Sequence, residues 1–350
     1  MSSAWQIAEH EPQDWKSTEA VENLWLVHDI PKPTPGPGEV LLNIKAAALN
    51  FRDVMIVAHS PAYPVRAIPD LVPCADAAGV IEAVGPGSKW KVGDKVLVNS
   101  TNWIDGPVPR YDEGESIGSG NLHGTLREYA VFTDSRLISF PSHLSFAEAA
   151  SLGGAAGTAV HTLFFGPLPF QKGSTVVAQG TGGVSAFTIQ LAAAAGATVI
   201  ATSSSDEKLE TARSLGASHF INYKKTPEWE AEVLRITNGR GADHVVDVAG
   251  AMTIEQSLRA TKQGGMVSVI GFLTESKPTD LIVPIILGAK VIHGILGVSN
   301  GMLEKLVEVY EEHQLHPPIA RVFKWHEAKD AYAELRNLSG VGKIIIEVGA

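Results

Sequence analysis

The residues with the clearest chemical meaning form a glycine-rich turn, Gly180-Thr181-Gly182-Gly183-Val184-Ser185. An apolar stretch typical of a β-strand precedes it, and an alanine-rich stretch typical of a helix follows it. Gly180 permits a tight turn, and Gly182 lets a phosphate approach the backbone, where free N–H groups and the helix dipole attract negative charge. Ser185 stands where glycine or alanine is usual and is small enough for close helix–strand packing. The turn predicts a binding site for the pyrophosphate of a dinucleotide.

The end of the next strand indicates which dinucleotide is preferred. Enzymes that use NAD place Asp or Glu about 20 residues further on, where the carboxylate binds the ribose 2′-hydroxyl. This chain has Thr202-Ser203-Ser204-Ser205 there, and the first acidic residue is Asp206. Hydroxyl groups donate to a 2′-phosphate, and Lys208 and Lys224 add positive charge nearby. The pattern favours NADPH over NADH, the alternative being that the serines only cap the helix that begins at Asp206.

Composition excludes several other functions. The 350-residue chain has a formal net charge of −10, which argues against a nucleic-acid partner because such binding relies on clustered Lys and Arg. Cys74 is the only cysteine, so neither an intrachain disulfide nor a four-cysteine zinc site can form. We find no secretory signal and no apolar run long enough to cross a membrane, so we expect a cytoplasmic protein without a membrane partner.

Two patterns of elements divide the chain. Residues 1–150 contain short apolar runs separated by Gly and Pro, which predicts a mostly β, barrel-like domain that also takes in residues 297–350. Residues 151–296 alternate apolar strands with helices, which predicts an α/β domain with a doubly wound parallel sheet. The polar, glycine-bearing stretch Ser100–Gly124 predicts a long functional loop. The six strands expected in the second domain are Ser174–Gln179, Thr198–Thr202, His219–Asn222, His244–Val248, Met266–Ile270 and Lys290–Leu296.

Motifs along nearly the whole chain resemble those of the medium-chain dehydrogenase/reductase superfamily. They are Ala48–Asp53, Pro73–Ile81, Val92–Val96, Gly157–Ala159 and Ala201–Tyr223, of which the last is similar to quinone oxidoreductases and zinc-free relatives of alcohol dehydrogenase. The resemblance implies a chaperonin-10-like barrel beside a six-stranded Rossmann domain. It also implies that Lys208 and Tyr223 contact the 2′-phosphate of NADPH, and that Thr158 lies near the nicotinamide ribose or phosphate.

Ligands of open α/β sheets bind at the carboxyl ends of the strands, so segments at those ends should line the nicotinamide pocket. The residues that we predict to bind the cofactor are Thr158, Gly180, Thr181, Gly182, Gly183, Val184, Ser203, Ser204, Lys208, Tyr223, Ala249, Gly271, Phe272, Leu296 and Val298.

The positions that bind a catalytic zinc in metal-dependent members of this superfamily differ here. They correspond to Asn50, to Cys74-Ala75-Asp76 and to Ala150 or a neighbour, and Asp76 alone cannot hold the metal. We therefore predict that the protein has no metal site. Another group must then stabilise negative charge on the substrate.

Two residues are predicted to be catalytic. Tyr63 resembles a tyrosine that enoyl reductases of the family direct at their substrate, and Asn50 stands where the first zinc ligand would be. The alternatives are a packed aromatic ring for Tyr63 and a turn residue that binds backbone for Asn50. His59, His123 and His161 are candidate acids by residue type alone.

These features predict an NADPH-dependent, zinc-free oxidoreductase that transfers hydride to a quinone, an enone or another activated double bond of a small molecule. A zinc-free alcohol or carbonyl oxidoreductase, including one that acts on a specialised metabolite, is an alternative. A non-catalytic, cofactor-binding accessory protein is another. The apolar edge strand near residues 290–296 predicts a homodimer, because an unprotected edge invites pairing.

Overall fold

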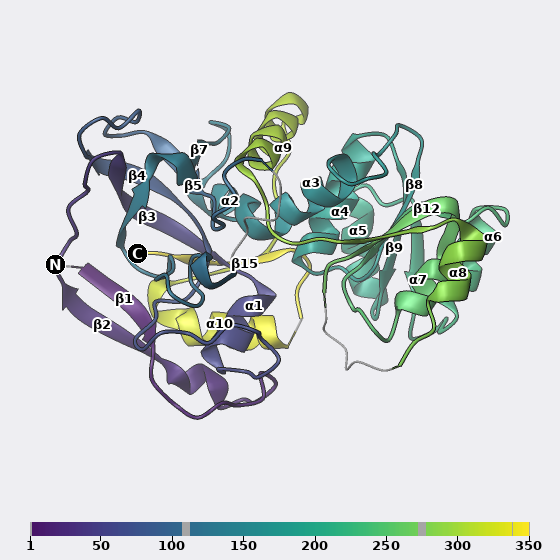
Figure 1. Ribbon diagram of the computed structural model, residues 1–350, viewed down its shortest axis with the longest axis horizontal. Helices are drawn as coiled ribbons and strands as arrows, with labels where there is room; N and C mark the ends of the chain where they lie inside the picture. Colours follow the sequence, from purple (N-terminus) through teal and green to yellow (C-terminus); the bar gives the residue numbers. More distant parts are fainter. Residues whose placement is uncertain (1, 107–112, 272–277, 338, 350) are drawn as a thin grey trace. The chain divides into compact units, whose positions relative to one another are not determined.

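The computed structural model describes residues 2–106, 113–271, 278–337 and 339–349 (Figure 1). The chain divides into two compact units. The first is formed by Met1–Gly157 together with Gly297–Ala350, and the second by Thr158–Leu296.

The second unit is built on a parallel sheet of six strands in the order β10-β9-β8-β11-β12-β13. The chain enters at β8, extends outward to β10 and then returns to β11, so the direction of winding reverses beside β8. Ligands of doubly wound sheets bind at such a reversal. The predicted doubly wound sheet is confirmed. The strands are β8 (Thr175–Ala178), β9 (Thr198–Ser203), β10 (His219–Asn222), β11 (Ala242–Asp247), β12 (Thr261–Val269) and β13 (Val291–Gly294).

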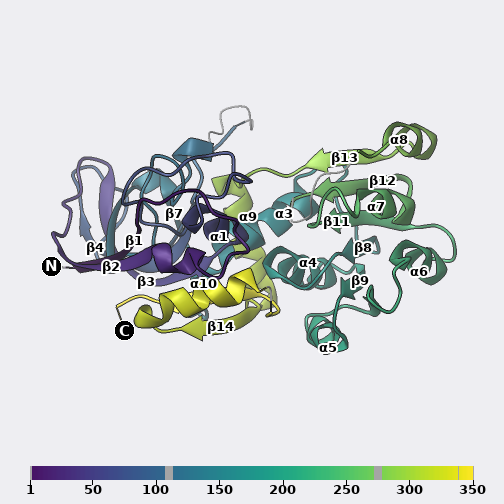
Figure 2. The ribbon, with the colours of Figure 1, turned by 90° about the horizontal axis from the view of Figure 1, so that it is seen from below.

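Helices cover both faces of this sheet (Figure 2). On one face, Trp229 and Val233 of α6 and Leu258 of α7 share an apolar core with Val177 and Val245 of the sheet. On the other face, α4 packs against β8 and β9, and α5 against β9 and β10. The helices are α3 (Gly157–Phe164), α4 (Gly183–Ala194), α5 (Asp206–Ser214), α6 (Trp229–Ile236), α7 (Ile254–Ala260) and α8 (Ile282–Gly288).

The short helix α8 was not predicted from the sequence, and it contains a proline, Pro284, within an otherwise apolar stretch. Pro284 is the third residue of α8. Proline is tolerated in a first helical turn because the N–H that it lacks would have no partner within the helix there. Pro284 is therefore compatible with the helix.

The first unit is mostly β and is organised around the long strand β3 (Glu39–Leu49). One edge of β3 pairs with β4, and the other pairs first with β6 and then with β15. The strand order is β14-β15-β3-β4-β5-β7, and β1 and β2 form a separate antiparallel pair. The remaining strands are β1 (Ser2–Ile7), β2 (Leu24–Ile30), β4 (Asp76–Val84), β5 (Lys95–Val98), β6 (Tyr129–Thr133), β7 (Leu137–Ser139), β14 (Ile319–Phe323) and β15 (Lys343–Glu347).

Besides short 3-10 turns, the described part of this unit contains four α-helices and a π-helical turn. They are α1 (Phe51–Val57), α2 (Phe146–Ala150), α9 (Asn300–His313), α10 (Ala328–Arg336) and the π-helical turn η5 (Leu152–Ala156). Among the described residues, no helix is both long and apolar enough to span a membrane.

Candidate active site

The glycine-rich turn connects the end of β8 to the start of α4 in the second unit. Gly180 has φ +71°, a left-handed conformation that favours glycine. Its N–H donates to Thr202 Oγ1 at 3.2 Å, which attaches the turn to the end of β9. Ser185 donates from Oγ to the Gln179 carbonyl oxygen at 2.5 Å. This hydrogen bond connects the first turn of α4 to the residue that follows β8.

Gly182 is the residue at which the turn fits a phosphate best. A Cβ atom added there would meet no heavy atom within 4 Å, so the protein's own packing does not require glycine. Gly182 caps α4, a helix of 12 residues whose first N–H groups have no acceptor within the helix. Free N–H groups at a helix start are the donors that a pyrophosphate requires, and open space at Gly182 allows its close approach. Gly183 and Val184 follow as the first residues of α4.

The end of β9 lies directly beside this turn. Thr181 Oγ1 and Ser203 Oγ are 3.4 Å apart, and Tyr223 donates its backbone N–H to the Ser203 carbonyl oxygen at 3.0 Å. Ser204 is half-buried, and Ser205, the N-cap residue of α5, makes no side-chain capping hydrogen bond. The predicted residues Thr181, Ser203 and Tyr223 therefore meet at one point of the sheet edge.

Asp206, the first carboxylate after the end of β9 along the chain, is already bound by other side chains. Its Oδ1 accepts from Asn222 Nδ2 at 2.7 Å, and its Oδ2 is paired with Lys225 Nζ. These hydrogen bonds hold the pKa of Asp206 below its ordinary value. Lys208 is half-buried on the first turn of the same helix. The first acidic residue after Ser203 therefore has its charge compensated.

The carboxyl end of β11 carries a residue that sequence analysis did not identify. Asp247 is fully buried, and its carboxylate accepts from Ser257 Oγ (2.7 Å), Thr253 Oγ1 (2.9 Å) and Gln179 Nε2 (3.3 Å). It also accepts from the backbone N–H groups of Ala249 (3.0 Å) and Gly250 (2.8 Å). Asp247 thereby determines the conformation of the predicted nicotinamide-binding turn. A carboxylate that ends an apolar strand was the available sequence signal.

The other residues predicted to lie near the nicotinamide differ from one another in burial and in packing. Gly271 packs against β11, because a Cβ atom there would lie 2.0 Å from the Val248 carbonyl oxygen. Leu296 is 53% exposed, and Thr158 is half-buried on α3. Phe272 lies outside the described residues. Val298 belongs to the first unit, where its side chain is buried, and its carbonyl oxygen accepts from Thr101 Oγ1 at 2.7 Å.

In the first unit, the sheet brings three polar side chains together. Leu49 of β3 pairs with Ile344 of β15, and Ala48 of β3 pairs with Asp76 of β4. Asn50 directly follows β3, Lys343 directly precedes Ile344, and Asp76 opens β4. The register of three neighbouring strands therefore places Asn50, Asp76 and Lys343 at the same end of the sheet.

These three side chains form one hydrogen-bonded cluster. Lys343 Nζ donates to the Leu49 carbonyl oxygen (2.6 Å) and to Asn50 Oδ1 (2.8 Å), and it lies 3.4 Å from Asp76 Oδ2. Asn50 Nδ2 donates to Asp76 Oδ2 at 2.9 Å. The side chains of Lys343 and Asp76 are 2% and 0% exposed, whereas Asn50 is half-buried and so reaches the surface.

The third side of the cluster is formed by Gly154 of η5, not by Ala150. Gly154 donates its N–H to Asp76 Oδ2 at 2.9 Å, and a Cβ atom there would lie 3.0 Å from Asn50 Oδ1. Ala150 is buried at the end of the preceding helix. Gly154 lies in the π-helical turn, a rare element that is often found at functional sites.

The cluster does not fit a catalytic zinc. Such a site needs three protein ligands of the His, Cys or carboxylate type, and only Asp76 among Asn50, Asp76 and Gly154 is one. The Lys343 ammonium also lies against both side-chain oxygens that a metal would need. Within the described residues, no group of three or more His, Cys, Asp or Glu side chains is arranged to hold a metal ion.

A second buried carboxyl group lies one turn away. Asp53 Oδ2 accepts from the Asn50 N–H at 2.7 Å, and Oδ1 lies 3.7 Å from Arg52 Nε. Burial raises the pKa of Asp53 to about 6, although Arg52 and the Asn50 N–H act in the opposite direction. Arg52 also donates to the Ile117 carbonyl oxygen, which ties the stretch Ser100–Gly124 to α1.

The other candidate acids of this unit have structural contacts. Tyr63 follows α1, donates its backbone N–H to Ser60 and packs against the apolar core. His123 Nδ1 accepts from the Val72 N–H at 3.1 Å, and the His59 ring packs against His10. In the second unit, the ring of His161 packs against His293.

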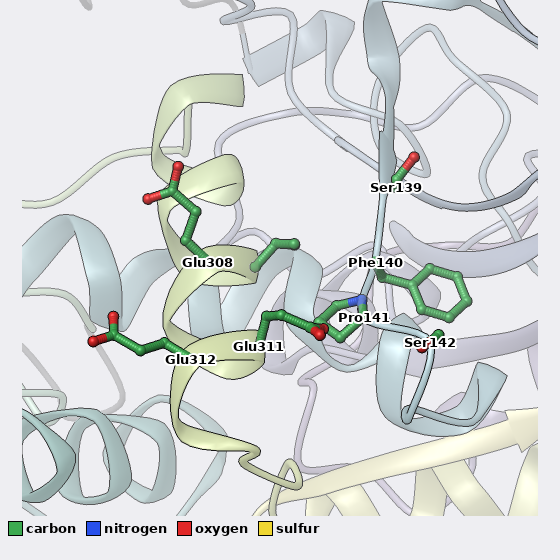
Figure 3. A pocket seen from close by; sticks show the side chains of 8 residues that line it. Ser139, Phe140, Pro141, Ser142, Glu308, Glu311 and Glu312 are labelled. Atoms are coloured by element: carbon green, nitrogen blue, oxygen red, sulfur yellow. The ribbon is translucent and has the colours of Figure 1, made fainter.

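A shallow groove of the first unit lies apart from all predicted site residues. Phe140 and Pro141 form one wall, and α9 forms the other (Figure 3). Glu311 points toward Pro141, whereas Glu308 and Glu312 point away from it (Figure 3). Acidic side chains on this wall would repel a pyrophosphate, so the groove does not suit the cofactor.

Comparison with known proteins agrees with this architecture. A family model described as "Alcohol dehydrogenase GroES-like domain" matches residues 36–142, and one described as "Zinc-binding dehydrogenase" matches residues 183–312. A zinc-type alcohol dehydrogenase-like protein of Schizosaccharomyces pombe is 41% identical over 320 residues, which cover 89% of this chain and 91% of that protein. A 2-haloacrylate reductase of a Burkholderia species is 28% identical over 330 residues, covering 89% of this chain and 92% of that one.

A solved structure has the same fold over the whole length of the chain. The crystal structure of an NAD-dependent alcohol dehydrogenase is 32% identical, covers 100% of both chains and has a TM-score of 0.87. The matches thus span a GroES-like, mostly β domain and a Rossmann sheet in a single chain. The chain therefore belongs to the medium-chain dehydrogenase/reductase superfamily and is an oxidoreductase of that type.

Proposed function

We propose that this protein is an NADPH-dependent, zinc-free reductase of small molecules that carry an activated double bond, such as enones or quinones. The observation that carries the proposal is the end of β9. Ser203 and Ser204 stand where an NAD enzyme has a carboxylate, and the first acid after them along the chain, Asp206, is bound by Asn222 and Lys225. A 2′-phosphate would therefore meet hydroxyl groups and Lys208, without an opposing negative charge.

The second unit would hold NADPH through the glycine-rich turn, the end of β9 and the turn after β11. When bound, the nicotinamide supplies a hydride to an electron-poor carbon of the substrate. Gly182 and the start of α4 would bind the pyrophosphate, and Ser203, Lys208 and Tyr223 the 2′-phosphate. Asp247 would keep Ala249 in position beside the nicotinamide.

The first unit would supply the substrate site. When hydride adds to one carbon of the double bond, the displaced electron pair moves toward the conjugated oxygen, which needs a hydrogen-bond donor. The half-buried Asn50 amide is our candidate for that donor, with Tyr63 as the second catalytic residue. The proton that completes the reduction would come from Tyr63 or from water.

Two observations bear on the substrate class. The relative named 2-haloacrylate reductase favours reduction of an activated carbon–carbon double bond. The relatives named alcohol dehydrogenases favour a second candidate, an alcohol or carbonyl oxidoreductase. That this candidate works without zinc is argued only from the residues around Asn50. An amide donor at Asn50 is compatible with both, because both reactions place negative charge on an oxygen.

The test measures the dissociation constants of NADPH and NADH, and NADPH consumption with a panel of enals, quinones and ketones. We expect NADPH to bind at least tenfold more tightly, and Lys208→Met to remove most of that difference without weakening NADH. A charge-assisted hydrogen bond contributes about 1.5–3 kcal/mol, which corresponds to roughly tenfold or more in affinity. Lys305→Met on α9 is the control. Tighter binding of NADH by the unmodified protein would refute the NADPH assignment, and turnover of ketones alone would favour the second candidate.

A further inference from the structure

Lys343 is a buried cation whose position follows from the strand register. It opens β15, just before three buried isoleucines, and its pairing with β3 directs it to Asn50. A lysine is almost never fully buried unless it is paired. Here its ammonium donates to the Leu49 carbonyl oxygen and to Asn50 Oδ1, and it faces Asp76. The ammonium is thus held by three oxygen atoms from β3, from Asn50 and from β4.

Lys343 and Asp76 together determine the orientation of the Asn50 amide. An ammonium can only donate, and an ionised carboxylate can only accept. Asn50 Oδ1 must therefore face Lys343, and Nδ2 must face Asp76, as the distances of 2.8 Å and 2.9 Å show. The reversed amide would place N–H groups against the ammonium and oxygen against the carboxylate. A chain without the two charges would leave the orientation undetermined.

One hydrogen of Asn50 Nδ2 is bound to Asp76, and the part of the chain that the structure describes provides no acceptor for the second. Asn50 is half-buried, whereas Lys343 and Asp76 are fully buried, so Asn50 is the one member of the three that is partly accessible. Donation by the ammonium to Oδ1 draws electron density from the amide nitrogen, and this makes the second N–H a stronger donor.

We propose that Lys343 is a positioning residue: its ammonium orients the Asn50 amide and polarises it toward the substrate oxygen. This inference rests on the proposed function in taking Asn50 as the donor to that oxygen. Lys343 forms no covalent bond and keeps its proton throughout. Hydride adds to the carbon, the electron pair moves to the oxygen, and the Asn50 N–H stabilises the charge there.

The test compares Lys343→Met, which removes the ammonium, with the double variant Lys343→Met/Asp76→Asn, which removes both buried charges. The single variant leaves the Asp76 carboxylate buried without its cation, so it should lower the thermal midpoint, and the double variant should regain it. Lys324→Met is the control, because this exposed lysine of the same unit is paired with Glu347 at the surface.

We expect kcat to fall about 10- to 100-fold in both the single and the double variant, a loss comparable to that of an oxyanion donor or smaller, with the dissociation constant of NADPH unchanged. A double variant that regains both thermal midpoint and kcat would show that Lys343 only neutralises Asp76, and would overturn the proposal.

A second readout does not depend on turnover. In protein labelled with ¹⁵N-asparagine, the side-chain signal that disappears in Asn50→Asp identifies Asn50. We expect this signal to shift in Lys343→Met and in the double variant, but not in Lys324→Met. If the unmodified protein turns over none of the panel, the proposed function fails, yet this signal still decides whether Lys343 orients Asn50. An unshifted signal in Lys343→Met would overturn the inference.

Discussion

Asp53 is a carboxyl group that the fold keeps away from water at the start of α1. Its pKa, raised from 3.8 to about 6 chiefly by burial, makes the protein less stable when the carboxyl ionises. The native state holds this proton more tightly than the unfolded state. The contribution of protonated Asp53 to the free energy of unfolding is therefore fully present below pH 4, and it is lost as the pH rises through 6.

We therefore expect the stability of Asp53→Asn, measured relative to the unmodified protein, to increase between pH 4 and pH 7. Two pKa units correspond to about 2–3 kcal/mol at most. The measurement is the apparent thermal midpoint of both proteins between pH 4 and pH 7.5. The exposed Asp14→Asn is the control. A difference between Asp53→Asn and the unmodified protein that does not change with pH would contradict the burial argument.

At the scale of elements, two turns that we assign to the cofactor are joined through one carboxylate. Gln179 begins the glycine-rich turn and donates from its side chain to Asp247 and to Ser257. Asp247 in turn holds the N–H groups of Ala249 and Gly250. A change at Asp247 should therefore reach both turns, although they follow different strands.

Asp247→Asn replaces one acceptor oxygen by a donor that faces other donors. The expected cost is about 1–3 kcal/mol of stability, because buried groups are left without partners. We also expect roughly tenfold weaker NADPH binding, since the turn after β11 is no longer held. Isothermal titration and thermal unfolding measure the two effects. Asp243→Asn, a carboxylate at the opposite end of the same strand, serves as the control and should leave NADPH binding unchanged.

At the scale of the whole molecule, the second unit presents an apolar surface that suits a second copy of the chain. Strand β13 is at the edge of the described sheet and pairs with β12. The preceding helix α8 exposes Ile282, Val283, Ile286 and Leu287, each by more than half. An unprotected edge beside an exposed apolar helix invites association, so we propose that two copies pair through β13 and α8.

The double variant Ile286→Glu/Leu287→Glu should be monomeric, because four carboxylates would face one another across the two-fold axis. Light scattering of the unmodified and variant proteins tests this expectation. Val92→Glu provides the control, since Val92 is similarly exposed but belongs to the first unit. A dimer that survives both glutamates would place the interface elsewhere, and a monomeric unmodified protein would exclude the dimer.

Much of the second unit was predictable from local patterns. Apolar strands, glycine turns and helix-forming stretches depend on neighbouring residues, and each of the six predicted strands overlaps an observed one. The same reasoning was weaker in the first unit. Strands β1, β2, β6, β7 and β14 were not predicted, because strand preferences depend on packing against neighbouring strands more than on local sequence.

The sequence by itself therefore determined the doubly wound sheet, the glycine-rich turn and the absence of a carboxylate at the end of β9. Only the tertiary structure decided what surrounds Asn50. Asp76 and Lys343 lie 26 and 293 residues away along the chain, and they meet Asn50 because the register of β4, β3 and β15 aligns their ends. Strand register is set by long-range pairing, which no local pattern encodes. The buried ammonium beside Asn50 was for that reason invisible until the sheet was assembled.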